Sequence, residues 1–135
     1  MTRILIAEDS TIMQKMLKVI LEKDKSFEIV GIVADGEEAC KKVLELKPDI
    51  ILMDVRMPRM GGMEAIKKIM SETPTPIIVI SSAEPPGEVK AQALKNGAVS
   101  FIEKPKALDF SSIANKIITD IRTLSRLKLQ KKVFN

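Results

Sequence analysis

Residues 49–62 read DIILMDVRMPRMGG: a continuous apolar run, then the carboxylate of Asp54, then a loop rich in Met, Pro and Gly. An apolar run of this length is typical of a strand that is buried on both faces of a parallel sheet. Four other short apolar runs lie at residues 4–7, 27–34, 77–80 and 99–103. Together with residues 50–55 they predict five strands.

The segments between these strands predict helices, because apolar residues recur in them at the spacing of one helix face. Five strands that alternate with five helices indicate an α/β fold, and strands this apolar must be covered on both faces. Right-handed crossovers then give a doubly wound (βα)5 three-layer sandwich around a parallel five-stranded sheet. In such folds the functional residues lie at the carboxyl ends of the strands.

Capping signals mark the first two helices. Ser10 or Thr11 can cap the first helix, and Asp35 followed by Glu38 forms a capping box for the second. The apolar spacing also predicts which side chains face the core. We expect Ile12, Met16, Leu17, Ile20 and Leu21 to be buried in the first helix, and Ala39, Val43, Leu44 and Leu46 in the second.

The composition excludes several kinds of chemistry. The chain of 135 residues has no His, which excludes a Ser-His-Asp triad and a His-containing zinc site. Its single Cys, Cys40, excludes an internal disulfide. No apolar run approaches the roughly 18 residues that cross a bilayer, and the first ten residues do not resemble a signal peptide. We therefore expect one cytoplasmic domain that does not insert in a membrane.

The basic charge lies in the last part of the chain. Residues 1–105 hold 15 Lys and Arg against 16 Asp and Glu, whereas residues 106–135 hold 7 against 2. We expect residues 121–135 to form a basic helix extension or an interdomain linker. Such charge runs are usually solvated, and no DNA-binding motif follows, so specific binding of nucleic acid is not expected.

Polar residues stand at the ends of the predicted strands. Glu8 and Asp9 follow the first strand, Asp54 the third, Ser81 the fourth and Lys104 the fifth. Singly, each of these residues could simply mark the place where the chain returns to water. Jointly they bring three carboxylates, a hydroxyl and an ammonium to one rim, which indicates a Mg²⁺ site and phosphoryl transfer onto Asp54.

Four motifs, ILIAEDS, DIILMDVRMPRMGG, IIVISSAE and GAVSFIEKP, occur in this order, and residues 1–120 resemble the receiver domain of two-component response regulators. The resemblance implies the strand order 2-1-3-4-5, a histidine kinase as phosphoryl donor and an output face on helix four, strand five and helix five. It also implies a role for each matching residue. Asp54 would be the phosphoacceptor; Glu8, Asp9, Asp54 and the backbone carbonyl of Arg56 would hold Mg²⁺; Ser81 would be the switch hydroxyl, Lys104 the phosphoryl ion pair and Phe101 the aromatic switch.

Within that family, the runs MPRMGGMEAIKKIM, TPTPIIVISS and GAVSFIEKP are similar to the receiver domain of the chemotaxis methylesterase. That enzyme has a separate hydrolase domain with a His-containing triad, and this chain has neither the length nor a His for one. We therefore expect no enzymatic activity beyond autocatalytic phosphorylation and dephosphorylation. Two possibilities stay open: a receiver that precedes a C-terminal output domain, or a stand-alone single-domain regulator. We expect a monomer.

Other functions are less well supported by the residues. Aspartate-nucleophile phosphatases have an Asp-x-Asp motif, but in this chain the second residue after Asp54 is Arg56. A flavodoxin-like cofactor domain shares the topology, but the acidic first loop suits a cation rather than a bare phosphate. A phosphate-independent interaction module with a basic tail remains the alternative. Four residues depart from the family pattern. Glu8 stands where Asp is commoner, so we expect it to contact Mg²⁺ through water, and Gly61 predicts a looser loop. Phe101 lacks a hydroxyl, and Ser81 lacks the methyl group of Thr.

Overall fold

The structure is a computed structural model that describes residues 1–82, 86–106 and 109–134. Its centre is a sheet of five strands in the order β2-β1-β3-β4-β5, and every neighbouring pair is parallel. This confirms the predicted sheet and its order. The strands are β1 (Thr2–Ala7), β2 (Phe27–Val33), β3 (Ile50–Met53), β4 (Ile77–Ser81) and β5 (Ser100–Glu103).

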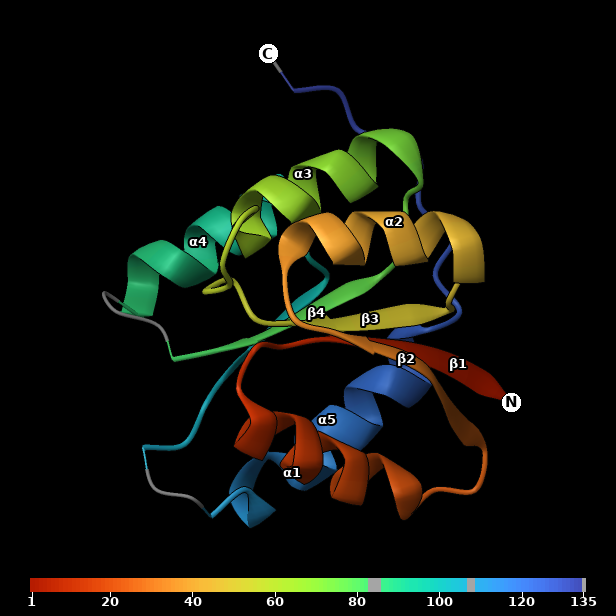
Figure 1. Ribbon diagram of the computed structural model, residues 1–135, viewed down its shortest axis with the longest axis vertical. Helices are drawn as coiled ribbons and strands as arrows, with labels where there is room; N and C mark the ends of the chain where they lie inside the picture. Colours follow the sequence, from red (N-terminus) through yellow and green to blue (C-terminus); the bar gives the residue numbers. More distant parts are fainter. Residues whose placement is uncertain (83–85, 107–108, 135) are drawn as a thin grey trace.

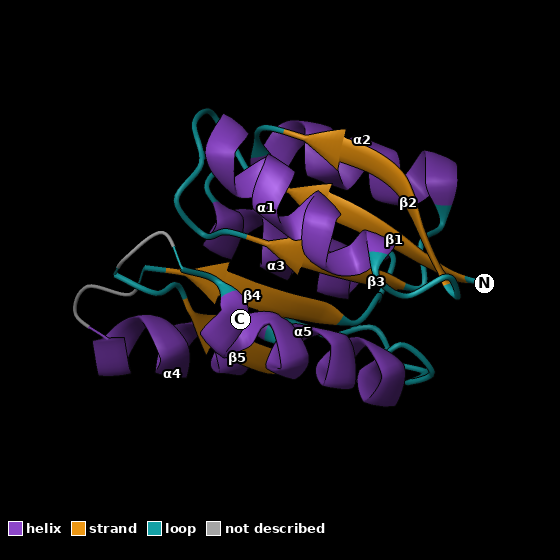
Figure 2. Cartoon of the chain, turned by 90° about the horizontal axis from the view of Figure 1, so that it is seen from below, coloured by secondary structure: helices purple, strands orange, loops and turns teal. Residues whose placement is uncertain are grey.

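Helices cover both faces of the sheet and complete the three-layer sandwich (Figure 1). Figure 2 shows α1 and α5 together in front of the sheet, while α2, α3 and α4 cover the opposite face. The helices are α1 (Thr11–Glu22), α2 (Gly36–Leu46), α3 (Gly62–Glu72), α4 (Pro86–Asn96) and α5 (Ser111–Leu124). No helix of the described residues is long and apolar enough to cross a membrane.

The pleat of the strands divides the apolar side chains into two cores. Along β1, Leu5 and Ala7 belong to the core under α2, α3 and α4, and Ile4 and Ile6 belong to the core under α1 and α5. This alternation follows from the two-residue period of a strand. We refer to them as the α2–α3–α4 core and the α1–α5 core.

The expected caps are present, but the predicted buried faces of two helices need correction. The side chain of Ser10 accepts a hydrogen bond from the amide of Met13, and that of Asp35 accepts one from the amide of Glu38. Ile12 is 59% exposed and Leu44 is 53% exposed, so the prediction that they face the core is wrong. Met13 and Cys40 are buried in those helices instead. Each buried stripe therefore lies slightly further round its helix than the apolar spacing suggests.

The chain beyond α5 also differs from expectation. The helix ends at Leu124, and residues 125–134 are not helical, so of the two possibilities stated for residues 121–135 the helix extension does not apply beyond Leu124. The interdomain linker stays a prediction. Figure 1 shows this segment passing from α5, beside the sheet, to the far side of α3. Leu129 and Phe134 pack against the α2–α3–α4 core there.

Candidate functional site

Backbone hydrogen bonds place the predicted site residues at one rim of the sheet. The amide of Glu8 donates to the carbonyl of Val33 at 2.9 Å, and the amide of Asp54 donates to the carbonyl of Ala7 at 3.0 Å. The amide of Lys104 donates to the carbonyl of Ser81 at 3.0 Å. The ladder bonds thus continue past the strand ends, so the positions of these residues are set by the sheet itself.

Asp54 is the centre of the site. Its Oδ1 accepts hydrogen bonds from the hydroxyl of Ser81 at 2.8 Å and from the amide of Arg56 at 3.0 Å. Its Oδ2 accepts one from Nζ of Lys104 at 2.7 Å. The Asp54 side chain is only 6% exposed. The structure therefore brings together the carboxylate, the hydroxyl and the ammonium that the sequence predicts at this rim.

Lys104 connects two buried carboxylates. Its Nζ lies 2.7 Å from Oδ2 of Asp54 and 2.7 Å from Oε1 of Glu8, and the side chain of Glu8 is 2% exposed. Burial is the strongest influence on Glu8 and raises the pKa of its carboxyl above the ordinary value. Burial acts to lower the pKa of Lys104, but its hydrogen bonds to Asp54 and Glu8, together with the negative charges of these carboxylates, outweigh this effect, and the pKa is raised. Lys104 is therefore charged at neutral pH and acts as the cation of the site.

The orientation of Glu8 depends on residues that the sequence reasoning did not assign to the site. Its Oε2 accepts a hydrogen bond from the amide of Ser10 at 2.9 Å. Its carbonyl accepts one from Nε2 of Gln14 at 2.6 Å. Gln14 lies about one helical turn beyond the cap of α1, which is the one sequence feature that could have indicated this contact.

Three carboxylates at the rim form a set that suits a metal ion. Ligand atoms of Glu8, Asp9 and Asp54 lie within 4.8 Å of one another; Asp9 is exposed, while the other two are buried. All-oxygen ligands of this kind, with room for water on the exposed side, are those that Mg²⁺ prefers. The residues therefore fit a magnesium ion, although Glu8 is bound to Lys104.

The loop between β3 and α3 is held by two close approaches of glycine. A Cβ on Gly62 would lie 2.3 Å from Cα of Val55, and one on Gly36 would lie 2.2 Å from the carbonyl oxygen of Met60. The amide of Gly36 also donates to that oxygen at 3.0 Å. Gly61 has a φ of −68°, which any residue can adopt, so the backbone freedom of glycine is not used at this position.

Phe101 lies on the same face of the sheet as Ser81. It pairs with Val79 in the register of β4 and β5, and Ser81 pairs with Glu103 two residues further along. Alternate residues of a strand share a face, so Phe101 is next to the hydroxyl along that face. Phe101 is half-buried and packs against the α2–α3–α4 core.

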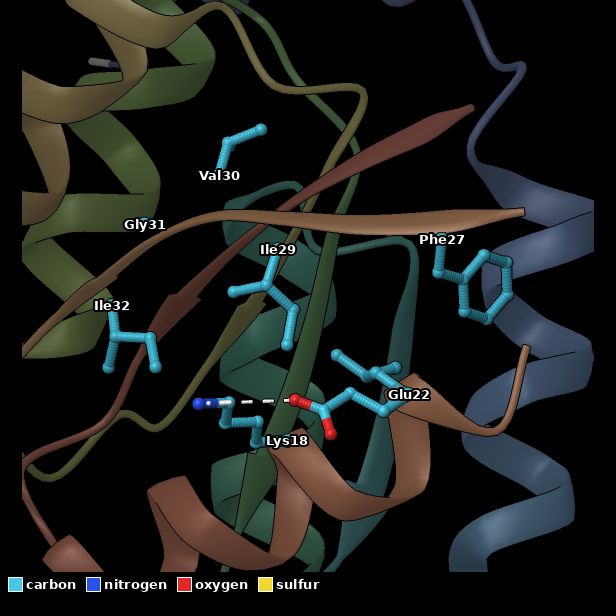
Figure 3. A pocket seen from close by; sticks show the side chains of 8 residues that line it. Lys18, Glu22, Phe27, Ile29, Val30, Gly31 and Ile32 are labelled. Atoms are coloured by element: carbon cyan, nitrogen blue, oxygen red, sulfur yellow. Dashed lines mark ion pairs between the residues drawn. The ribbon is translucent and has the colours of Figure 1, made fainter. Parts of the chain in front are cut away.

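A pocket elsewhere on the molecule does not contribute to this site. It lies between α1 and the edge strand β2, and Lys18 and Glu22 form an ion pair at its rim (Figure 3). Its lining includes none of the residues at the ends of β1, β3, β4 and β5. This pocket is therefore separate from the candidate site.

Comparison with known proteins agrees with this geometry. A model of the response regulator receiver domain matches residues 4–117. A protein-glutamate methylesterase/protein-glutamine glutaminase of Methanococcus maripaludis is 43% identical over 134 residues, which are 96% of this chain and 37% of the relative. One of Thermotoga maritima is 42% identical and covers 89% of this chain and 36% of the relative. The chain therefore spans less than two-fifths of the length of these relatives.

Solved structures give the same result. The response regulator domain of Thermotoga maritima CheB superimposes with a TM-score of 0.87 at 39% identity, covering 93% of this chain and 97% of that domain. A chain of the CheX-CheY-BeF3-Mg²⁺ complex from Borrelia burgdorferi matches with a TM-score of 0.77 at 29% identity, covering 90% of this chain and 87% of that chain. The family match, the relatives and the fold agree, and the chain belongs to the response regulator receiver domain family.

Proposed function

We propose that this chain is the phosphoacceptor of a two-component pathway and that Asp54 receives a phosphoryl group from the phosphohistidine of a histidine kinase. The observation that carries the proposal is the arrangement around Asp54, whose two oxygens are held by Ser81 and Lys104. In the transfer, a carboxylate oxygen of Asp54 forms a bond to phosphorus. The bond between phosphorus and the donor imidazole nitrogen breaks, and the nitrogen keeps its electron pair.

The residues around Asp54 have separate roles in this proposal. Glu8, Asp9, Asp54 and the backbone carbonyl of Arg56 would hold Mg²⁺, which neutralises charge on the phosphoryl oxygens when it is bound. Lys104 supplies a positive charge that can pass from the carboxylate of Asp54 to a phosphoryl oxygen. The hydroxyl of Ser81 can donate to a second phosphoryl oxygen in the same way.

Switching follows from the change in charge. Phosphorylation replaces the single negative charge of the Asp54 carboxylate with a phosphoryl group that carries about −1.5 to −2 charges and three acceptor oxygens, which attracts Ser81 and Lys104 toward the new oxygens. Movement of Ser81 leaves space on the face of the sheet that it shares with Phe101. Phe101 then turns inward, and the surface formed by α4, β5 and α5 changes shape for its partner.

The relatives support a more specific setting. Because they are named as methylesterases and glutaminases and are much longer than this chain, we propose that the domain regulates an output domain in chemotaxis. The chain itself would act as a regulatory, monomeric domain in the cytoplasm, and residues 121–135 would lead toward the output domain. A stand-alone regulator, or an interaction module that needs no phosphate, is the alternative.

The test is the intact mass of the protein after incubation with acetyl phosphate, with and without Mg²⁺. We expect one Mg²⁺-dependent phosphoryl adduct in the wild type and none in Asp54→Asn. Glu103→Gln is the matched control, because Glu103 is an exposed acid at the end of β5 and should leave the adduct unchanged. A folded wild-type protein without an adduct would contradict the proposal and favour the phosphate-independent module.

A further inference from the structure

Residues 127–134, which we call the strap, are docked on the side of the molecule opposite to α5 (Figure 1). The amide of Lys132 donates to the carbonyl of Met70 at 2.9 Å. The Nζ of the same residue donates to the carbonyl of Lys95 at 2.9 Å. Leu129 and Phe134 pack against the α2–α3–α4 core. The strap is therefore attached at several points rather than extended into solvent.

The two hydrogen bonds of Lys132 join the ends of two helices. Met70 lies in the last turn of α3 and Lys95 in the last turn of α4, where carbonyl groups lack partners within their own helix. An ammonium at the end of a helix is also favoured by the helix dipole. The ring of Phe134 lies 5.9 Å from Nζ of Lys132 and 5.9 Å from Nζ of Lys67 on α3, which adds a cation–π contact on each side.

The helix that receives one of these bonds is weakly anchored. Among the described residues of α4, only Ala93 and Asn96 are buried, and both lie toward its C-terminal end. By contrast, α1, α2 and α3 each bury four or five residues. The N-terminal end of α4 begins at Pro86, shortly after Ser81 of the site. The lightly held N-terminal part of α4 thus lies nearest to the site, and its buried C-terminal end carries the carbonyl that the strap contacts.

We propose that the strap is a sensor of the position of α4: it is docked while Asp54 is unphosphorylated and loosens when Asp54 is phosphorylated. The docked contacts occur together with the Lys104–Asp54 ion pair, so they belong to the unphosphorylated arrangement. A shift of α4 that follows the movement of Ser81 carries the carbonyl of Lys95 away from Lys132. This inference rests on the proposed phosphorylation of Asp54.

Amide hydrogen exchange of the 135-residue chain tests whether the strap is docked. We expect the Lys132 amide to exchange slowly in the wild type. Lys132→Ala keeps that amide but removes the ammonium, and we expect exchange in the strap to be about fivefold faster. Lys131→Ala is the matched control, because Lys131 is an exposed neighbour of the same charge and should change nothing. Unprotected amides throughout the wild-type strap would overturn the proposal.

The same measurement with acetyl phosphate and Mg²⁺ tests the link to the site. The phosphoryl adduct is quantified by intact mass in each sample, so a failure of phosphorylation is distinguished from a failure of the coupling. We expect faster exchange in the strap of the phosphorylated wild type and no change in Asp54→Asn. Equal protection in fully phosphorylated and unphosphorylated protein would overturn the coupling while leaving the proposed function intact.

Coupling between two sites must be reciprocal. If phosphorylation loosens the strap, loss of the strap contact must favour phosphorylation. Reversible binding of beryllium fluoride with Mg²⁺, as a mimic of the phosphoryl group, gives the equilibrium that this argument needs. We expect Lys132→Ala to bind it about twofold to fivefold more tightly than Lys131→Ala. Equal affinities of the two variants would contradict the sensor.

Discussion

At the scale of single residues, the site is organised by a lysine placed between two carboxylates. Nζ of Lys104 lies 2.7 Å from an oxygen of each, and the side chains of Glu8 and Asp54 are almost completely buried. Taking two carboxylates out of water is unfavourable unless a cation accompanies them. Lys104 thus supplies in the folded chain the charge that a divalent cation would otherwise provide.

Replacing this lysine should make stability depend on magnesium. We expect Lys104→Met to lower the free energy of unfolding by about 3 kcal/mol, because it leaves both carboxylates without a cation. Millimolar Mg²⁺ should recover most of that loss in the variant and stabilise the wild type less. The measurement is the urea midpoint with and without Mg²⁺, with Lys106→Met as an exposed control. Equal Mg²⁺ effects on variant and wild type would contradict this account.

The sequence predicts which residues meet at the rim, but not how they are paired. The order of strand ends is enough to bring Asp54, Ser81 and Lys104 together, because the ends of parallel strands share one edge. The expectation that Glu8 reaches Mg²⁺ through water stays a prediction. The ion pair between Glu8 and Lys104 depends on side-chain rotamers and on the amide of Ser10, and neither has a sequence signature.

At the scale of elements, the loop after β3 is fixed by glycines at which a side chain does not fit. Gly36 starts α2 and lies against the carbonyl of Met60, so the loop and the start of that helix are locked together. Arg59, in the same loop, has a φ of 63° and pairs with Asp35 at 3.4 Å. The loop that follows Asp54 is therefore held from the side of α2.

Alanine at these glycines should have very different costs. We expect Gly36→Ala to lower the free energy of unfolding by at least about 2 kcal/mol, because its Cβ would lie 2.2 Å from a backbone oxygen. Gly61→Ala is the matched control. Its nearest neighbour would be the carbonyl oxygen of Val55 at 3.8 Å, and we expect a change within about 1 kcal/mol. Thermal unfolding of both variants provides the measurement, and similar losses would count against this explanation.

The spacing of apolar residues predicts the helices correctly but misplaces part of their buried faces. Ile12 and Leu44 fit the apolar spacing, yet each is more than half exposed. A helix presents an apolar stripe about 100° wide to the core. Residues at the two margins of this stripe can be apolar whether they are buried or exposed. Tertiary packing decides between the margins, which is why Met13 and Cys40 are buried instead.

At the scale of the whole molecule, a pair of charged side chains ties the last helix to the first part of the chain. Nε and Nη2 of Arg122 on α5 donate to Oδ2 of Asp24, in the turn between α1 and β2, at 3.0 and 2.6 Å. Hydrogen bonds from Ser26 and then from Arg122 lower the pKa of Asp24 to about 2. The contact joins residues 98 positions apart, so it depends on the complete fold.

This contact should stabilise the fold only while Asp24 is ionised. A carboxyl group whose pKa is lowered on folding stabilises the fold at pH values above its unfolded-state pKa of 3.8. This contribution is lost as the pH falls toward 2. We expect wild type to be more stable than Asp24→Asn at pH 6 and the difference to shrink between pH 4 and pH 2. The check is the urea midpoint of both proteins at each pH. A difference that stays constant across this range would show that ionisation of Asp24 is not its source.

The strap is the largest part of the structure that the sequence did not predict. Its basic residues indicate a solvated segment, whereas Lys132 contacts Met70 and Lys95, which lie far from it in the sequence. Backbone carbonyls at helix ends accept such bonds whatever their side chains are. No residue pattern therefore marks the docking position.

The division of the apolar side chains by the sheet has a consequence for how the domain tolerates change. Among the described residues, the α2–α3–α4 core and the α1–α5 core share no side chain, since each strand residue points to one side only. Effects of substitutions that share no partner usually add. Each face can therefore drift in sequence, or be redesigned for stability, without matching changes across the sheet.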